Sequence, residues 1–256
     1  MSLRYSLPQP IWRRSHYLER MTLRELTMAF FQHHAVWVYV ILGLLCVGLA
    51  ASRPAPIARI VMAISAAALI YPVTWYALHR WVLHGKWMFK TKLTAGIWKR
   101  VHYDHHIDPN HLEVLLGALY TTLPTIALTT GPIGWLLAGP PGAAAAFATG
   151  LFVTCAYEYV HCIEHLPYKP RNRMLTHMKA RHLEHHFHDE SGNYGITNFA
   201  WDRLFGTFYT RDMRQRRSPT VFNLGYTKEV AQRYPWVAER SGGEAPDRPT
   251  RRRSNV

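Results

Sequence analysis

Residues 114–157 read VLLGALYTTLPTIALTTGPIGWLLAGPPGAAAAFATGLFVTCAY, a run of 44 residues without a charged side chain. As one continuous helix it would be roughly 66 Å long at 1.5 Å per residue, about twice the hydrocarbon thickness of a bilayer. The run must therefore fold back on itself. Gly139-Pro140-Pro141-Gly142 is the natural place for the turn, and Gly131-Pro132 is a second candidate.

Two shorter uncharged runs precede this stretch. Residues 35–51 and 60–78 are each long enough for a spanning helix, and the turn sequence SRPAP (52–56) lies between them. Pro72 is a plausible kink in the second run. The pattern predicts an all-α integral membrane protein with four transmembrane helices in two hairpins. A soluble fold with buried core helices is the alternative, and the 44-residue run disfavours it.

The charges are distributed very unevenly along the chain. Thirty Lys and Arg residues stand against 16 Asp and Glu, a formal net charge of +14, which favours an anionic membrane face or nucleic acid as partner. The apolar runs favour the membrane, and no nucleic-acid motif is present. With four crossings, 28 of the 30 positive charges share one side, and only Arg53 and Arg59 lie on the other. The positive-inside rule then predicts a cytosolic helical cap.

These observations suggest three parts. We expect a cytosolic or interfacial N-terminal segment over 1–34, a membrane domain over 35–240 and a disordered basic tail over 241–256. No cleavable signal peptide is visible, because the first 34 residues are polar, basic and aromatic.

Histidines carry the chemistry of the polar segments. Helical positions i, i+3 and i+4 share one face, so His102, His105 and His106 can converge on one centre, as can His182, His185 and His186. His79 and His84 are about 500° apart around an ideal α-helix and need two centres, a bend or a frayed helix end. Ten of the 16 histidines fall into four such groups: His79 and His84; His102, His105 and His106; His161 and His165; and His182, His185 and His186.

Ten imidazoles exceed one coordination sphere, because zinc takes four ligands and octahedral iron takes six. We therefore expect two metal ions with about five histidines each. Imidazole suits several metals, so the ligands alone do not identify the ion. The His-Glu-x-x-His pattern of zinc hydrolases is absent, and the His182-x-Glu184 pair lacks the cysteine pair of a deaminase.

Five further residues are candidates to support the ligands. Asp104, Glu184 and Asp202 are candidates to accept an imidazole N–H and hold a ligand in one tautomer. Asn198 is a candidate to hold a metal-bound water, and His177 lies five residues before His182. For each of these, an ordinary solvated, capping or turn position is the alternative reading.

The histidine motifs resemble the fatty acid hydroxylase/sterol desaturase superfamily of membrane di-iron enzymes. The chain looks closest to the fatty acid 2-hydroxylase branch, because four residues separate His79 from His84 and three separate His161 from His165. The motifs that carry the resemblance are HRWVLHG (79–85), HYDHH (102–106), HCIEHLP (161–167), HLEHHF (182–187) and YGITNFAWDRLFGT (194–207).

The resemblance implies an oxygenase that hydroxylates a lipid acyl chain at C2. It would use O2, two iron ions, which zinc can replace in purified protein, and electrons from a separate protein, since only 34 residues precede the first apolar run. Carotenoid, sterol-like and headgroup substrates are the enzymatic alternatives. A histidine-rich metal transporter or sensor is the non-enzyme alternative, although its ligands should lie nearer mid-membrane. The excess of Arg over Lys favours a bacterial inner membrane; in a eukaryote the protein would lie in the ER membrane.

Overall fold

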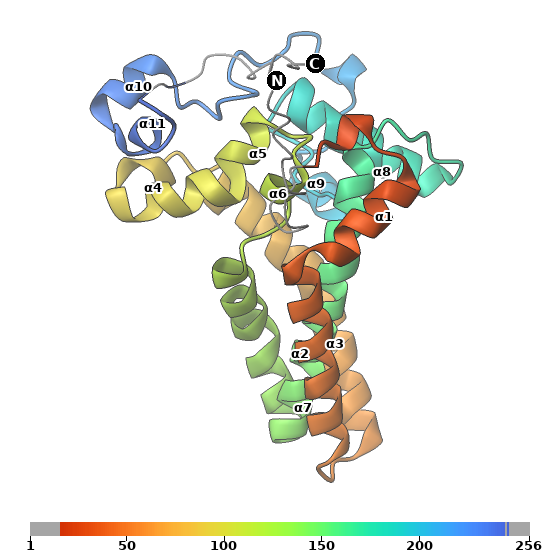
Figure 1. The fold of residues 1–256 in the computed structure, drawn as a ribbon. Coiled ribbons are helices and arrows are strands. Elements are labelled where there is room, and N and C mark those ends of the chain that lie inside the picture. Colours follow the sequence, from red (N-terminus) through yellow and green to blue (C-terminus); the bar gives the residue numbers. More distant parts are fainter. Residues whose placement is uncertain (1–15, 244, 246–256) are drawn as a thin grey trace, which may run out of the picture.

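Every regular element in the described part of the chain is helical. The computed structural model describes residues 16–243 and 245, and within these residues the only β-type pairing is an isolated bridge between Tyr17 and His111. Figure 1 shows a T-shaped molecule, in which a narrow stalk of long helices carries a broad cap of short ones.

Three long helices form the stalk. They are α2 (His34–Ala51), α3 (Ile57–Ala77) and α7 (Leu119–His165), and both α2 and α3 pack against α7 (Figure 1). The predicted helical runs at 35–51 and 60–78 are confirmed, and Pro72 lies inside α3 without ending it. Three segments are long and apolar enough to cross a membrane: His34–Ala51, Ile57–Leu83 and Leu112–His165.

The long uncharged run reverses direction within α7. Ala138 and Gly139 have non-helical backbone angles, and Gly139 has a φ of 62°, a conformation that glycine adopts without strain. The backbone at Gly134 meets that of Gly142 so closely that a Cβ added to Gly134 would lie 2.2 Å from the Gly142 carbonyl oxygen. The reversal therefore lies at the start of the predicted turn Gly139-Pro140-Pro141-Gly142, and the alternative site Gly131-Pro132 remains helical.

The stalk surface is apolar where a soluble protein would be polar. Leu136 on α7 is 84% exposed and Leu69 on α3 is 74% exposed. Inside the stalk, polar groups pair with one another: the Tyr39 and Thr122 hydroxyls lie 2.7 Å apart, and the Tyr71 hydroxyl donates to Thr154. This distribution is that of a protein whose solvent is lipid.

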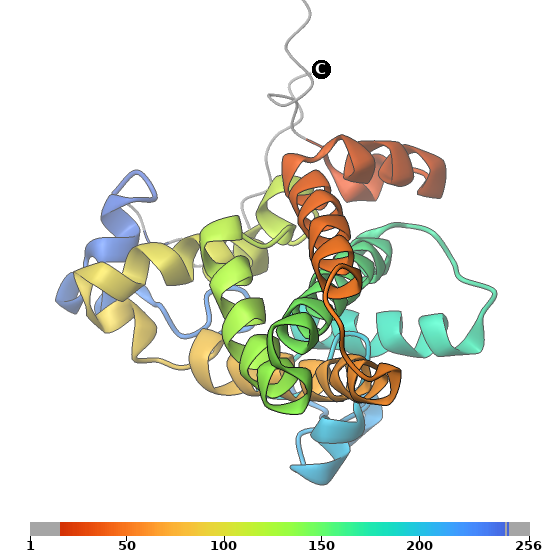
Figure 2. The same cartoon turned by 90° about the horizontal axis from the view of Figure 1, so that it is seen from below.

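The cap surrounds the upper end of the stalk (Figures 1 and 2). Its α-helices are α1 (Leu23–Gln32), α4 (Lys92–Trp98), α5 (Asp104–Ile107), α6 (Leu112–Leu115), α8 (Arg173–Phe187), α9 (Ala200–Leu204), α10 (Lys228–Arg233) and α11 (Trp236–Glu239). Two π-helices are η3 (Leu78–Leu83) and η5 (Lys99–Tyr103), and three 3-10 turns are η2 (Leu18–Arg20), η4 (Met88–Lys90) and η6 (Arg211–Met213).

Two apolar clusters hold the cap together. One joins α1, α6 and the end of α7 through residues such as Phe30, Leu112 and Cys162. The other packs Trp98 and Tyr226 together, and so joins α4 to the C-terminal segment. The predicted basic tail over 241–256 lies almost wholly outside the described residues, as do the first fifteen residues of the predicted N-terminal segment.

Candidate metal centre

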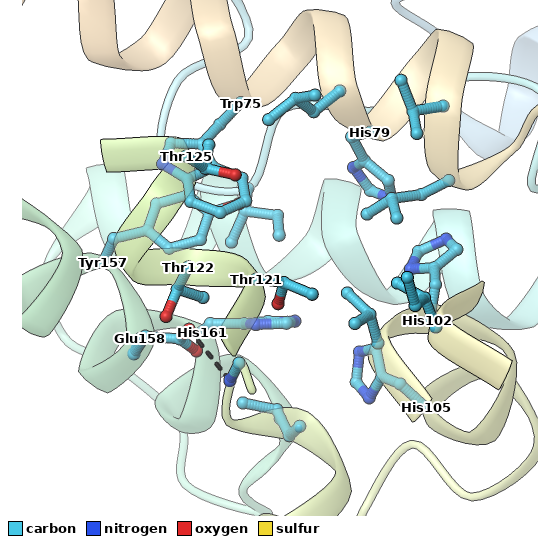
Figure 3. Close-up of a pocket in the computed structure, with 18 of the residues that line it drawn as sticks. Trp75, His79, His102, His105, Thr121, Thr122, Thr125, Tyr157, Glu158 and His161 are labelled. Atoms are coloured by element: carbon cyan, nitrogen blue, oxygen red, sulfur yellow. Dashed lines mark hydrogen bonds between the residues drawn. The ribbon is translucent and has the colours of Figure 1, made fainter. Parts of the chain in front are cut away.

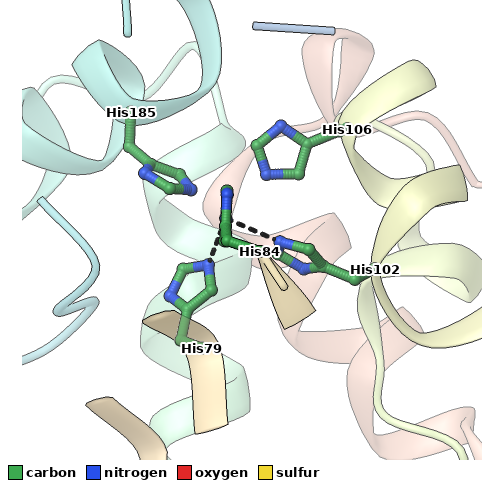
Figure 4. A group of neighbouring side chains, drawn as sticks. All are labelled: His79, His84, His102, His106 and His185. Atoms are coloured by element: carbon green, nitrogen blue, oxygen red, sulfur yellow. Dashed lines mark hydrogen bonds between the residues drawn. The ribbon is translucent and has the colours of Figure 1, made fainter. Parts of the chain in front are cut away.

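All ten predicted histidines come together at the junction of stalk and cap, in two groups of five. We name the groups after one member of each. The ligand atoms of each group lie within 4.8 Å of one another. The His84 group consists of His79, His84, His102, His106 and His185, and Figure 4 shows these rings converging. The His105 group consists of His105, His161, His165, His182 and His186.

A local change of helix type brings His79 and His84 together. His79 lies in the π-helix η3 and His84 is the residue that follows it; the His84 N–H donates to the His79 carbonyl 3.0 Å away, an i→i+5 bond. The wider π-turn places residues five apart on one side, so the two Nε2 atoms lie 3.2 Å from each other. This π-turn was not among the three solutions considered for the spacing, which were two centres, a bend and a frayed helix end.

The expectation that each three-histidine motif converges on one centre is wrong. In the first motif, His102 and His106 belong to the His84 group and His105 belongs to the His105 group. In the second motif, His185 belongs to the His84 group, and His182 and His186 belong to the His105 group. Neighbouring residues on a helix point about 100° apart, so each motif faces both groups at once. The His106 and His186 rings, one from each group, lie 4.3 Å apart between centroids. The two groups are therefore adjacent and share two helices.

Backbone carbonyls orient the His84 group. The Nδ1 atoms of His79, His106 and His185 lie 2.6, 3.0 and 2.7 Å from the carbonyl oxygens of Tyr194, Val221 and Gly192. A carbonyl can only accept, so each Nδ1 carries the proton and each Nε2 lone pair is left for a ligand. This is the arrangement that metal-binding histidines require.

Several imidazole nitrogens in both groups have no partner among the described residues. They include Nε2 of His106 and His185 and both ring nitrogens of His105 and His186, all fully buried. Burying polar nitrogen without a hydrogen bond costs about 1–3 kcal/mol per group. The donor set fits a pair of metal ions with five nitrogen ligands each, because ligation would satisfy these lone pairs.

Burial also keeps these rings neutral, which ligation requires. Desolvation lowers the pKa of His106 to about 3 and the pKa of His185 to about 3. The pKa values of His102, His105 and His182 are lowered well below the ordinary value, first by burial and then by neighbouring imidazoles. Neutral imidazole is the ligating form.

The carboxylates predicted to hold imidazole N–H groups have other partners. Asp104 accepts from Lys99 Nζ at 2.6 Å, and Glu184 lies 2.9 Å from an Arg181 guanidinium nitrogen. Asp202 contacts the loop that orients His79 and not the imidazole itself. It accepts the Tyr194 and Gly195 N–H groups, at 2.8 and 2.7 Å, and so positions the loop whose Tyr194 carbonyl holds His79.

The other two predicted neighbours lie apart from the ten histidines. His177 is exposed and its ring stacks on Phe208. The Asn198 side chain accepts the Ala200 N–H at the start of α9.

Glu164 is a site residue that the sequence reasoning missed. Its side chain is fully buried, neither carboxylate oxygen has a hydrogen-bond partner among the described residues, and one oxygen lies 3.9 Å from His182 Nδ1. The signal was available, because Glu164 stands between two ligands in the motif HCIEH. The orienting carbonyls of Val221 and Gly192 left no such signal, since any residue supplies a carbonyl.

An apolar pocket of about 180 Å³ opens beside both histidine groups. In Figure 3, His79, His102 and His105 line one side, and Trp75, Thr125 and Tyr157 line the other. The polar groups of the lining are few: they include Thr121, Thr122 and Glu158, whose carboxylate accepts the Gly117 N–H at 3.1 Å. Such a pocket suits an apolar chain with a small polar group near one end.

Comparison with known proteins gives a consistent set of matches. A family model described as fatty acid hydroxylase matches residues 64–207. The chain is 28% identical over 178 residues to dihydroceramide fatty acyl 2-hydroxylase FAH1 of Arabidopsis thaliana, covering 68% of this chain and 71% of that protein. It is 29% identical over 147 residues to ceramide very long chain fatty acid hydroxylase SCS7 of Saccharomyces cerevisiae, covering 54% of this chain and 35% of the yeast protein.

Among solved structures, the chain is similar to full-length scs7p, in which only the hydroxylase domain is visible. The TM-score is 0.59 at 21% identity, over 78% of this chain and 71% of that one. This likeness shows a shared fold. The chain spans only about a third of the yeast protein's own length in the sequence comparison.

Proposed function

The chain belongs to the fatty acid hydroxylase family, and we propose that it hydroxylates the acyl chain of a membrane lipid at C2. The family matches confirm the resemblance expected from the histidine motifs, including its 2-hydroxylase branch. The observation that carries the proposal is the apolar pocket lined by members of both five-histidine groups.

We propose that the His84 and His105 groups each hold one metal ion, and that the physiological metal is iron. Bound iron would activate O2 for insertion of one oxygen atom into an unactivated C–H bond. Zinc can replace it in overexpressed protein, because Zn²⁺ binds such sites more tightly than Fe²⁺. Two electrons per turnover would come from a separate carrier protein.

The chain's own residues would bind and place the substrate. Trp75, Leu78 and Tyr157 offer the apolar wall along which an acyl chain can lie. Thr121, Thr122 and Glu158 offer hydroxyl and carboxylate groups for the polar end of the lipid, which keeps C2 close to the histidines. The enclosed apolar lining would exclude bulk water from the reacting carbon.

We also propose that the protein crosses the membrane four times, with α2, α3 and the two legs of α7 as spans. The support is the reversal at Ala138 and Gly139, together with the exposed apolar surface on all three stalk helices. The charge distribution supports a cytosolic cap, and the arginine-rich composition supports a bacterial inner membrane.

The test is acyl analysis in a host without its own hydroxylase, grown under 18O2. We expect wild-type protein to raise the ratio of 2-hydroxy to non-hydroxy acyl chains, with 18O in the new hydroxyl group. His105→Ala should abolish the product, and His34→Ala, at an exposed histidine outside both groups, should retain it. Label from water would contradict an oxygenase. Oxidation of a ring or headgroup would contradict the acyl substrate, and altered metal export without lipid oxidation would favour a transporter.

A further inference from the structure

We propose that a groove on the outer face of α8 docks an acidic one-electron carrier protein. The inference rests on the proposed function, since an oxygenase of this type needs two electrons per turnover. The groove has a volume of about 760 Å³ and is lined by residues of α8 and of the segment 211–217.

The groove lies directly behind the metal ligands. At 100° per residue, Ala180, Leu183, Glu184 and Phe187 occupy one side of α8, and the ligands His182, His185 and His186 occupy the opposite side. A single helix therefore separates the groove from both histidine groups.

Positive side chains outnumber negative ones in the groove lining, three to two. Arg211, Arg214 and Arg217 line it. Of the two acidic residues in the lining, Glu184 is paired with Arg181, and Asp212 follows Arg211 in the chain without an ion pair between them among the described residues. An Arg214 guanidinium nitrogen lies 2.5 Å from an Asp189 carboxylate oxygen. Arg211 and Arg217 are exposed, and neither forms an ion pair with a carboxylate in the described part of the chain. Such a surface steers and orients an acidic protein.

Aromatic contacts connect the groove to the His105 group. The Arg217 guanidinium lies 4.6 Å from the Phe222 ring centroid, and Phe222 packs edge-on against Phe187, with centroids 6.2 Å apart. Phe187 in turn lies 6.3 Å from the ring of its neighbour His186. Phe187 is 38% exposed in the groove, so a docked carrier would touch a side chain that contacts a ligand. Electron tunnelling weakens steeply with distance, which makes this short route the favourable one.

Two other surfaces near the histidines suit different occupants. The pocket beside Trp75 and Tyr157 is apolar and would hold the acyl chain, and the stalk is covered by apolar side chains. Neither attracts an acidic soluble protein.

The electron balance fixes what the docked partner must do. One oxygen atom of O2 enters the C–H bond, and the other leaves as water after taking up two electrons and two protons. Two reduced carrier molecules are therefore oxidised per product, each by one electron. The carrier must bind and leave twice in a turnover, which suits a docking site built on exposed charge and not on a large apolar contact.

The test uses an acidic [2Fe–2S] ferredoxin, kept reduced by its reductase, with purified full-length protein in detergent. The double substitution Arg211→Glu/Arg217→Glu should raise the KM for ferredoxin by about tenfold or more at low salt, because it reverses the charges that attract the partner. The matched control, Lys169→Glu/Arg171→Glu, makes the same change in net charge at exposed positions between α7 and α8. The control should stay within about twofold of wild type, and 0.5 M NaCl should remove the difference.

A second measurement isolates Phe187. Phe187→Leu should lower the ferredoxin-supported kcat with little change in KM and unchanged metal content. Phe187→Trp, which keeps an aromatic ring in the groove, should restore most of the rate. Equal kcat values for the three proteins would contradict the route through Phe187.

Dithionite-supported turnover separates this proposal from the proposed function. If no wild-type sample hydroxylates lipid with either reductant, the proposed function fails. If dithionite supports hydroxylation but ferredoxin neither binds nor reduces wild type, or if the arginine double variant keeps the wild-type KM, the docking proposal fails. Loss of binding to phosphatidylglycerol vesicles in that variant, with ferredoxin binding unchanged, would make the groove a lipid-headgroup site and overturn the proposal.

Discussion

Neighbouring histidines in this protein belong to different histidine groups. His185 Nδ1 donates to the Gly192 carbonyl 2.7 Å away and its ring joins the His84 group, while His186 joins the His105 group. A substitution at either position should therefore remove a ligand from one group and leave the other complete. The two adjacent residues test whether the groups bind metal independently.

We predict that His185→Ala and His186→Ala each lower the metal content from about two ions per chain to about one. Loss of one ligand from a five-nitrogen site weakens the binding of the ion held there. The donors of the second site stay in place. Elemental analysis of purified protein measures the ratio, with His34→Ala as the control that keeps two ions. A wild-type content of one ion or none in well-folded protein would refute the two-metal arrangement.

Glu164 differs from the carbonyl acceptors because its carboxyl group can ionise. Its buried carboxylate lies closest to His182 Nδ1, at 3.9 Å, in the group that lacks the three backbone acceptors of the His84 group. Carboxylates beside metal-bound imidazoles hold ring orientation and raise ligand basicity. Glu164 is thus placed to position His182.

Glu164→Gln, which keeps the shape of the side chain and removes its charge, should weaken retention of one of the two ions by about 10–100-fold. Competition with a metal chelator, followed by elemental analysis, measures this without reference to activity. Glu239→Gln, at an exposed position on α11, is the matched control. Identical chelator curves for the two variants would show that Glu164 has no part in holding metal.

Among the elements, the two π-helices and the broken helix α7 determine where the ligands lie. The π-helices η3 and η5 end α3 and α4 at the points where His79, His84 and His102 are needed. The reversal in α7 returns the chain to the cap, where its last turns carry His161 and His165. Close packing of the two legs of α7 is therefore a requirement of the site.

Gly134→Ala should destabilise the protein by about 1–3 kcal/mol, because the added Cβ would lie 2.2 Å from the Gly142 carbonyl oxygen. Gly131→Ala, one turn away on the same leg, meets nothing within 4 Å and should be neutral or stabilising by up to about 1 kcal/mol. Thermal unfolding in detergent compares the two. Equal Tm values would mean that the legs do not pack as closely as the structure shows.

At the scale of the whole molecule, the prediction concerns membrane topology. With 28 of 30 Lys and Arg residues on one side of four crossings, the cap and both termini should be cytosolic. Reporter fusions at Pro54 and Pro141 should map to the side opposite to fusions at Asp108 and the C-terminus. Asp108 on the same side as Pro54 would exclude the four-crossing arrangement.

Local patterns in the sequence were enough to predict the helical class, the helices at 35–51 and 60–78, the reversal near Gly139, and which ten histidines cluster. These follow from hydropathy, turn chemistry and ligand type, which act over a few residues. The π-turn between His79 and His84, by contrast, was not among the solutions that the spacing suggested.

The division of ligands between the two groups was decided only by tertiary structure. His105 and His106 are adjacent in the chain, and nothing in their spacing says that they face different partners. The same holds for Tyr194, Gly192 and Val221, whose carbonyls orient ligands from sequence positions up to 115 residues away. A carbonyl is common to every residue, so only the packing of distant segments selects which one meets an imidazole.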